Sequence, residues 1–276
     1  MFELEIEKYC LLEEPLKHIK INTLFARAVI EKTETGKIFA DDTENPKTFY
    51  VVHPYGMSLL FGETNNKFFN KRFVEYCLNT NAARNKFEWM QAYPDSWNAL
   101  LSKLFTGKLV DSSASCDPPA ECIELNTRVN FTFDLERYLT FKKNNIGEEK
   151  YFIMRTDLEC FNLMTGSVAP SRLWDNADDF LEYGIGFSLF SDGKLATTAY
   201  SAFITEKELE FGIETMPEYR RRGFAQYACS ALIDYCISNN YEPVWACRLE
   251  NTASLALAQK LGFVPGLTLP YYRLAL

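Results

Sequence analysis

The clearest pattern of apolar and polar positions lies in the segment 208–215. Every second residue there is apolar (Leu209, Phe211 and Ile213), and the residues between them are glutamates and one glycine. A period of two is typical of a strand with one face in a core. Gly212 carries no side chain, so we expect it to leave the other face of this strand open.

The rest of the second half predicts strands and helices around this segment. An Asp-Gly pair within 191–194 predicts a tight hairpin, and helical spacing of apolar residues recurs before and after it. The expected elements, in chain order, are a strand at 151–155, a helix at 171–183, strands at 185–190, 195–204 and 208–215, a helix at 225–239, a strand at 244–247 and a helix at 252–261. They indicate an antiparallel meander followed by a mixed α/β segment.

The first half alternates helical and extended patterns in a way that loosely echoes the second half. A hairpin is predicted over 48–61, and helices are predicted over 68–78 and 96–105 on either side of an extended segment at 87–93. The polar stretch 142–150 precedes the strand at 151–155, and we place a domain boundary there. The predicted domains are 1–148 and 149–276.

Composition and charge exclude several classes of protein. A chain of 276 residues with 47% hydrophobic residues can bury a large core. Its net charge of -8 argues against general nucleic-acid binding, which needs a basic face. The apolar runs are too short to span a bilayer, and the glutamates of the N-terminus do not fit a signal peptide. We expect a cytoplasmic protein that binds no membrane.

The cysteines do not indicate a metal site or a disulfide framework. The chain has 8 Cys and 2 His, and no two cysteines are spaced as C-x-x-C. Without a secretory signal, buried reduced thiols are the better interpretation, and no metal is expected.

An arginine-rich turn follows the strand at 208–215. Arg220, Arg221 and Arg222 precede Gly223 and Ala225 at the start of the predicted helix. The first backbone N–H groups of a helix have no partner within it, and small residues let a phosphate approach them. The turn therefore fits a pyrophosphate, although a solvated basic turn before an amphipathic helix is an alternative.

The context of this turn resembles the GNAT superfamily of acetyl-CoA-dependent N-acetyltransferases. The resemblance rests on the strand, the run Pro-Glu-Tyr-Arg-Arg-Arg-Gly-Phe-Ala at 217–225, Asn251-x-x-Ser254 and Leu-Gly-Phe at 261–263. It covers about 149–276 and is strongest for the two-domain zwittermicin A resistance group. It implies α/β (α+β) architecture, a mixed and mainly antiparallel sheet flanked by helices. Domain 1–148 is then a degenerate copy or a separate α/β domain, on the acceptor side.

The resemblance also implies which residues hold acetyl-CoA, the cosubstrate. Backbone groups of Ile213, Glu214 and Thr215 would pair with the pantetheine arm, and Asn251 and Ser254 would contact CoA from the last helix, unless Asn251 only caps that helix. The pyrophosphate would lie on the turn formed by Arg220, Arg221, Arg222, Gly223, Phe224 and Ala225.

Acetyl transfer to an amine needs a base that removes a proton from the amine. Glu210 and Glu214 are the candidates, with solvent-facing charges as the alternative. The tyrosine that the family usually has four residues before the Gly of Leu-Gly-Phe is here Ala258. Tyr271 or Tyr272 could replace it as general acid, or could simply pack in the final strand.

The sequence therefore predicts an N-acetyltransferase that acts on a primary amine of a small molecule. The charge mildly favours a cationic acceptor. A GNAT-like module that binds CoA or a protein partner without turnover is the main alternative, and phosphate recognition on RNA is a weaker one. A homodimer is left open.

Overall fold

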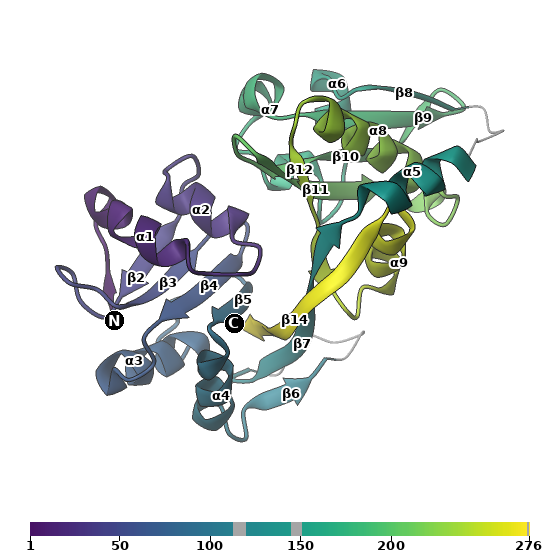
Figure 1. The fold of residues 1–276 in the computed structure, drawn as a ribbon. Coiled ribbons are helices and arrows are strands. Elements are labelled where there is room, and N and C mark those ends of the chain that lie inside the picture. Colours follow the sequence, from purple (N-terminus) through teal and green to yellow (C-terminus); the bar gives the residue numbers. More distant parts are fainter. Residues whose placement is uncertain (113–119, 145–150, 275) are drawn as a thin grey trace. The chain divides into compact units, whose positions relative to one another are not determined.

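The computed structural model describes residues 1–112, 120–144, 151–274 and 276, which form two compact units (Figure 1). Unit 1 consists of Met1–Val129, Arg248–Glu250 and Leu267–Leu276, and unit 2 of Asn130–Cys247 and Asn251–Gly266. The predicted boundary at 148 lies outside the described residues, and the contacts divide the chain earlier, after Val129. The end of the chain belongs to unit 1 because its last strand pairs there, from Tyr271 opposite Gln91 to Leu274 opposite Glu88.

The sheet of unit 2 confirms the predicted meander. Its strands are β8 (Tyr151–Arg155), β9 (Gly186–Ser191), β10 (Lys194–Ile204), β11 (Glu208–Thr215) and β12 (Glu242–Val244). They lie in the order β12-β11-β10-β9-β8, and all neighbours are antiparallel except β11 and β12. Asp192 and Gly193 both have positive φ, 50° and 74°, as a tight hairpin turn requires.

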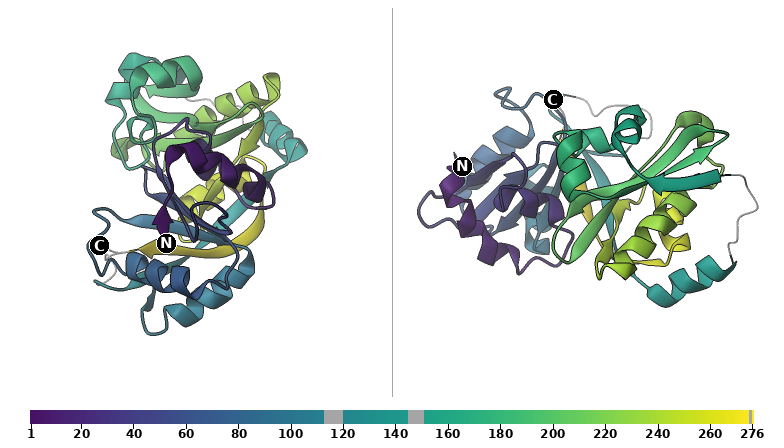
Figure 2. Two further views of the ribbon diagram at one scale, coloured as in Figure 1. Left: turned by 90° about the vertical axis from the view of Figure 1, so that its left-hand side faces the viewer. Right: turned by 90° about the horizontal axis from the view of Figure 1, so that it is seen from above.

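Helices cover both faces of this sheet (Figure 2). They are α5 (Leu135–Asn144), α6 (Leu158–Leu163), η2 (Pro170–Arg172), α7 (Ala177–Tyr183), η3 (Pro217–Tyr219), α8 (Phe224–Ser238) and α9 (Thr252–Lys260). The single helix predicted over 171–183 is wrong, because η2 and α7 are separate. The side chain of Asn176 accepts a hydrogen bond from the Asp179 amide at 2.8 Å, and this cap starts α7.

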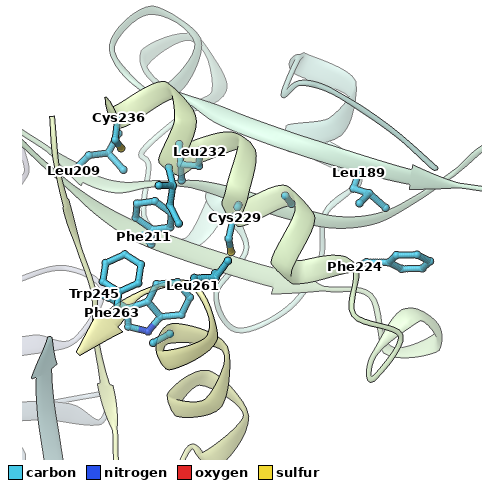
Figure 3. Packing of buried hydrophobic residues seen from close by; sticks show 14 of the residues in the cluster. Leu189, Leu209, Phe211, Phe224, Cys229, Leu232, Cys236, Trp245, Leu261 and Phe263 are labelled. Carbon is cyan, nitrogen blue, oxygen red and sulfur yellow. The ribbon is translucent and has the colours of Figure 1, made fainter. Parts of the chain in front are cut away.

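The core of unit 2 lies between its sheet and α8. The predicted apolar face of α8 is fully buried, and Figure 3 shows Cys229, Leu232 and Cys236 directed toward the core that holds Leu209 and Phe211. Burial raises the pKa of the Cys229 thiol above its ordinary value and that of Cys236 to about 12. These two thiols therefore stay protonated and are not nucleophiles.

The opposite face of β11 is covered, and the prediction that Gly212 leaves it open is wrong. Tyr200 lies opposite Gly212 in β10, and a Cβ on Gly212 would come within 2.4 Å of the tyrosine ring. The Tyr200 ring also packs edge to face with Phe180 of α7, at 6.2 Å between centroids. The missing side chain of Gly212 thus makes room for a buried tyrosine.

Unit 1 is built from the first half of the chain and the final strand. Its strands are β1 (Phe2–Glu3), β2 (Lys37–Ala40), β3 (Thr48–Val52), β4 (Met57–Gly62), β5 (Glu88–Tyr93) and β6 (Leu109–Asp111), with residues of β7 (Ile123–Phe133), β13 (Ala246–Arg248) and β14 (Phe263–Leu274). Its helices are η1 (Ile6–Leu12), α1 (Glu13–Leu16), α2 (Leu24–Ile30), α3 (Lys67–Cys77) and α4 (Asp95–Leu104). The predicted hairpin is present as β3 and β4.

The two units repeat one topology, as the loose echo in the sequence suggested. In unit 1 the order β1-β2-β3-β4-β5 has three antiparallel pairs followed by the parallel pair β4 and β5. Unit 2 repeats this with β8 to β12, and a helix joins the parallel strands in both units, α3 in the first and α8 in the second.

Candidate functional site

The parallel strands β11 and β12 of unit 2 separate after three residue pairs. Glu208, Leu209 and Glu210 lie opposite Glu242, Pro243 and Val244, and the pairing then stops. At the next residue, the Trp245 carbonyl accepts a hydrogen bond from the Phe131 amide of β7 at 3.1 Å, so the chain leaves β11 for other strands. Among the described residues, no strand pairs with this edge of β11 from Phe211 to Thr215.

Two features maintain this separation. The buried ring of Trp245 packs on Phe211 and Phe263, at 5.8 Å and 5.2 Å between centroids (Figure 3). On the other side of β11, the register of β10 shifts between Ser201 and Phe203, opposite Phe211 and Glu210. Such a bulge bends and twists a strand pair. The open edge of β11 is therefore set by packing on one side and a bulge on the other.

The turn at 216–223, which we call the arginine turn, connects the open strand to α8. Arg221 and Gly223 have positive φ, 63° and 81°, and Gly223 is the N-cap of α8 without a side-chain hydrogen bond. The first N–H groups of α8 therefore have no side chain of their own cap as acceptor. They form a backbone site for an anion, with the helix dipole adding to the attraction.

The three arginines of this turn differ in their contacts. Arg220 donates from Nε to the Thr215 carbonyl at 3.0 Å and from Nη2 to Glu214 at 3.3 Å. The guanidinium of Arg222 lies over the rings of Phe224 and Tyr219, at 4.6 Å and 5.4 Å. All three arginines are exposed. Arg220 and Arg222 are thus held beside the helix N-terminus, where their charge favours an anion.

This geometry agrees with comparisons with known proteins. The family model described as GNAT acetyltransferase matches residues 14–272, which is most of the chain. The chain belongs to the GNAT acetyltransferase family. An uncharacterized N-acetyltransferase of Bacillus subtilis (strain 168), YdfB, is 24% identical over 241 residues, which is 87% of this chain and 85% of that protein.

Solved GNAT structures share the fold. A GCN5-related N-acetyltransferase-like protein from Streptococcus suis 89/1591 matches with a TM-score of 0.70 and 17% identity, over 98% of this chain and 100% of that chain. A tandem GNAT protein from the clavulanic acid biosynthesis pathway matches with a TM-score of 0.62 and 9% identity, over 97% of this chain and 94% of that chain. The repeated topology of the two units agrees with a tandem arrangement.

Glu214, one of the two predicted bases in this GNAT chain, is engaged in structural hydrogen bonds. Its carboxylate accepts from the Val168 amide at 3.0 Å, from the Thr215 amide at 3.2 Å and from Arg220. A Cβ on Gly166 would come within 2.2 Å of this carboxylate, so only glycine fits there. Glu214 fastens the 165–168 loop and Arg220 to the end of β11.

Glu210, the other predicted base, lies at the point where the strands separate. It is buried and pairs with Val244, the last residue before the chain turns away at Trp245. It also faces Phe203 beside the bulge of β10. Of the two glutamates, Glu210 is the one next to the open edge.

Asn251 and Ser254 form the N-terminal cap of α9. The Asn251 side chain accepts a hydrogen bond from the Ser254 amide at 3.2 Å, which makes it the N-cap. The Ser254 hydroxyl accepts from Trp245 Nε1 at 3.2 Å. The structure therefore shows the capping role, the alternative that the sequence left open, and it links the cap to the residue at which the strands separate.

The aromatic candidates for a general acid belong to unit 1. Tyr272 is buried beside α4 and donates to Asn98 at 3.2 Å, and burial raises its pKa above the ordinary value. Tyr271 is buried and stacks on Trp89 at 5.2 Å between centroids. Ala258, at the usual tyrosine position, is fully buried in the core of unit 2. Tyr271 and Tyr272 thus belong to unit 1, whereas the arginine turn belongs to unit 2.

The sequence did not point to Tyr200 and Val168, which support the site. The Tyr200 hydroxyl donates a hydrogen bond to the Val168 carbonyl at 2.9 Å, on the same loop that Glu214 holds. These residues are 32 positions apart, so local periodicity cannot connect them. Gly212 was a usable signal, because a glycine inside a strand often marks the close approach of another group.

The described residues give two further results on ligands and membranes. No three His, Cys, Asp or Glu side chains among them gather in a way that could bind a metal. Within the same residues, none of the helices combines the length and the apolar character that a membrane span needs.

Proposed function

We propose that this chain transfers the acetyl group of acetyl-CoA to a primary amine of a small molecule. The observation that carries the proposal is the separation of β11 and β12 directly before the arginine turn. Backbone amides of Arg221 to Ala225 would hold the pyrophosphate, with Arg220 and Arg222 as nearby cations. The open edge at Ile213 to Thr215 would pair with the amides of the pantetheine arm.

Unit 1 supplies an internal comparison that supports this assignment. There β4 and β5 stay paired over five positions, from Met57 opposite Trp89 to Phe61 opposite Tyr93. The turn before α3 is short, and the side chain of Asn66 accepts from the Phe69 amide at 3.0 Å. A closed strand pair and a capped helix offer no equivalent site, so we propose one CoA per chain, in unit 2.

Glu210 is our proposed base, acting directly or through a water molecule. It lies where a thioester laid along the open edge of β11 would end, and Glu214 is occupied by the 165–168 loop and Arg220. Attack of the neutral amine on the thioester carbonyl forms the amide bond and expels CoA as thiolate. The amine proton passes to Glu210. Because a thiolate is a fair leaving group, the reaction needs no general acid in place of the tyrosine whose position Ala258 occupies.

The test measures release of free CoA thiol from acetyl-CoA with a panel of primary amines. Acetyl transfer predicts thiol release that needs both the amine and the intact protein, with one acetylated amine formed per thiol. A module that only binds CoA, the alternative raised by Ala258, would bind CoA without any turnover on the panel. Untargeted detection of metabolites that gain an acetyl group would then name the acceptor.

A further inference from the structure

Where β5, β14 and β7 lie next to one another, one face of the unit 1 sheet carries charged and aromatic side chains. Residues of β5, β14 and β7 alternate, with Met90, Tyr272 and Ile123 packed toward α3 and α4. The residues between them point to the opposite side. The name arginine face is used here for Trp89, Gln91, Asn126, Arg248, Tyr271 and Arg273.

The arginines of this face are ordered by aromatic rings. Arg248 lies 4.7 Å from the centroid of the Trp89 ring, and Arg273 lies 5.5 Å from it. Trp89 in turn stacks on Tyr271. A guanidinium stacked on a ring keeps its N–H groups at the edge, where they can donate to a planar acceptor. This arrangement is suited to recognition of a carboxylate.

Arg248 contacts neutral groups. Its Nη1 donates to the Asn126 side-chain oxygen at 3.0 Å, and Trp89 supplies its ring contact. Glu124, the acidic residue of β7, accepts instead from Arg273 at 3.2 Å and from the side-chain amide of Asn126 at 3.1 Å. Arg248 therefore brings a positive charge to the face without an acidic partner in the described part of the chain.

Gln91 is a second and independent indication of a ligand. It is fully buried, and neither polar atom of its amide has a hydrogen-bond partner among the described residues. It lies opposite Tyr271, on the same face. A buried amide without partners is energetically unfavourable, and such groups usually meet a water or a ligand. Trp89 and Arg248 are only partly buried, so the face can be reached from their side.

We propose that the arginine face binds a small molecule that carries a carboxylate. Arg248 would take the carboxylate through two parallel N–H···O bonds, and Gln91 would add a neutral donor and acceptor. A neutral amide beside the guanidinium of Arg248 suits one negative charge better than a phosphate dianion.

The test uses calorimetry on the full chain with matched ligand pairs. L-phenylalanine is compared with phenethylamine, benzoate with benzamide, and inorganic phosphate is a third arm. We expect binding of the carboxylate member of each pair and at least about tenfold weaker binding in Arg248→Met, which keeps the length of the side chain and removes its charge. Arg248→Lys should recover part of the affinity. Gln91→Met should weaken binding without lowering the melting temperature.

The matched control is Arg137→Met, because Arg137 is an exposed arginine of α5 that pairs with Asp134 just before the helix. It should leave carboxylate binding unchanged, and CoA binding should persist in every variant, which separates this site from the proposed acetyl-CoA site. The proposal is overturned if no carboxylate binds at millimolar concentration, if uncharged partners or phosphate bind as tightly, or if Arg248→Met binds like the unaltered chain.

Discussion

At the scale of single residues, the environment of two glutamates on one strand separates their roles. Glu210 and Glu214 point to the same side of β11, four positions apart, and both are buried. Glu214 accepts three hydrogen bonds that tie a loop and Arg220 to the strand. Glu210 lies at the last residue pair before the strands separate. The alternation of the sequence alone could not distinguish them.

Replacing Glu210 by Gln tests its proposed role as the base. The amide keeps the shape of the side chain but cannot take the proton, so kcat should fall by about 10²-fold near neutral pH while CoA binding stays nearly intact. The loss should shrink at high pH, where the amine is already neutral. A steady-state pH series measures both, and normal rates from pH 6 to 9 would rule out Glu210.

Replacing Glu214 by Ala should mainly lower stability. The change removes the acceptor of the Val168 and Thr215 amides, and each buried N–H left without a partner costs about 1–3 kcal/mol. We expect the free energy of unfolding to fall by about 2–4 kcal/mol in denaturant titrations. Glu214→Gln, which keeps an acceptor oxygen, should lose less. Equal losses in both variants would mean that the charge and not the acceptor matters.

We expect CoA binding to be most sensitive to substitution at Gly223, where the pyrophosphate would approach the backbone. Gly223→Asp adds a Cβ and a carboxylate at the N-terminus of α8, so the affinity for CoA should fall by at least about tenfold. Gly193→Asp is the matched control, because Gly193 also has positive φ (74°) and an added Cβ there meets nothing within 4 Å. Unchanged CoA affinity in folded Gly223→Asp would contradict the site.

At the scale of elements, substitutions of Asn251 can show whether this residue only caps α9 or also contacts CoA. As the N-cap of α9, Asn251→Ala should lower the free energy of unfolding by about 1 kcal/mol, and Asn251→Asp should restore it because Asp also caps well. If the residue only caps, CoA affinity should be normal in the Asp variant. A loss of CoA affinity there with restored stability would instead indicate direct contact with CoA, since a carboxylate repels phosphate.

The elements that the sequence predicted best are those specified by local periodicity. The strands at 151–155 and 208–215 were predicted at their observed ends, and the apolar face of α8 is buried as expected. The break between η2 and α7 was missed because it depends on the Asn176 cap. The separation at Trp245 was missed because it depends on where β11, β12 and β7 pair, and such long-range pairing leaves no periodic signal.

At the scale of the whole molecule, long-range pairing also decides which segments form each unit. The contacts divide the chain after Val129, and the predicted boundary at 148 lies outside the described residues. The final strand returns to unit 1 through its pairing with β5. The arginine turn, by contrast, was found from sequence because its residues are contiguous.

The repeat of topology predicts the binding stoichiometry. Within the part of the chain that the structure describes, only unit 2 has the separated strands and a turn without a side-chain cap, so calorimetry should give one CoA per chain. Gly223→Asp should weaken that binding by at least about tenfold and reveal no second site. Two CoA molecules per chain would contradict the interpretation that the closed pair of β4 and β5 excludes the cofactor.

The closed strand pair of unit 1 has a consequence for how such a chain can change over generations. A cofactor site could arise there only with a longer turn, the loss of the Asn66 cap and the opening of several strand pairs. Each step alone breaks satisfied hydrogen bonds before any bound cofactor can compensate. Single substitutions therefore do not lead from the present unit 1 to a second site of this kind.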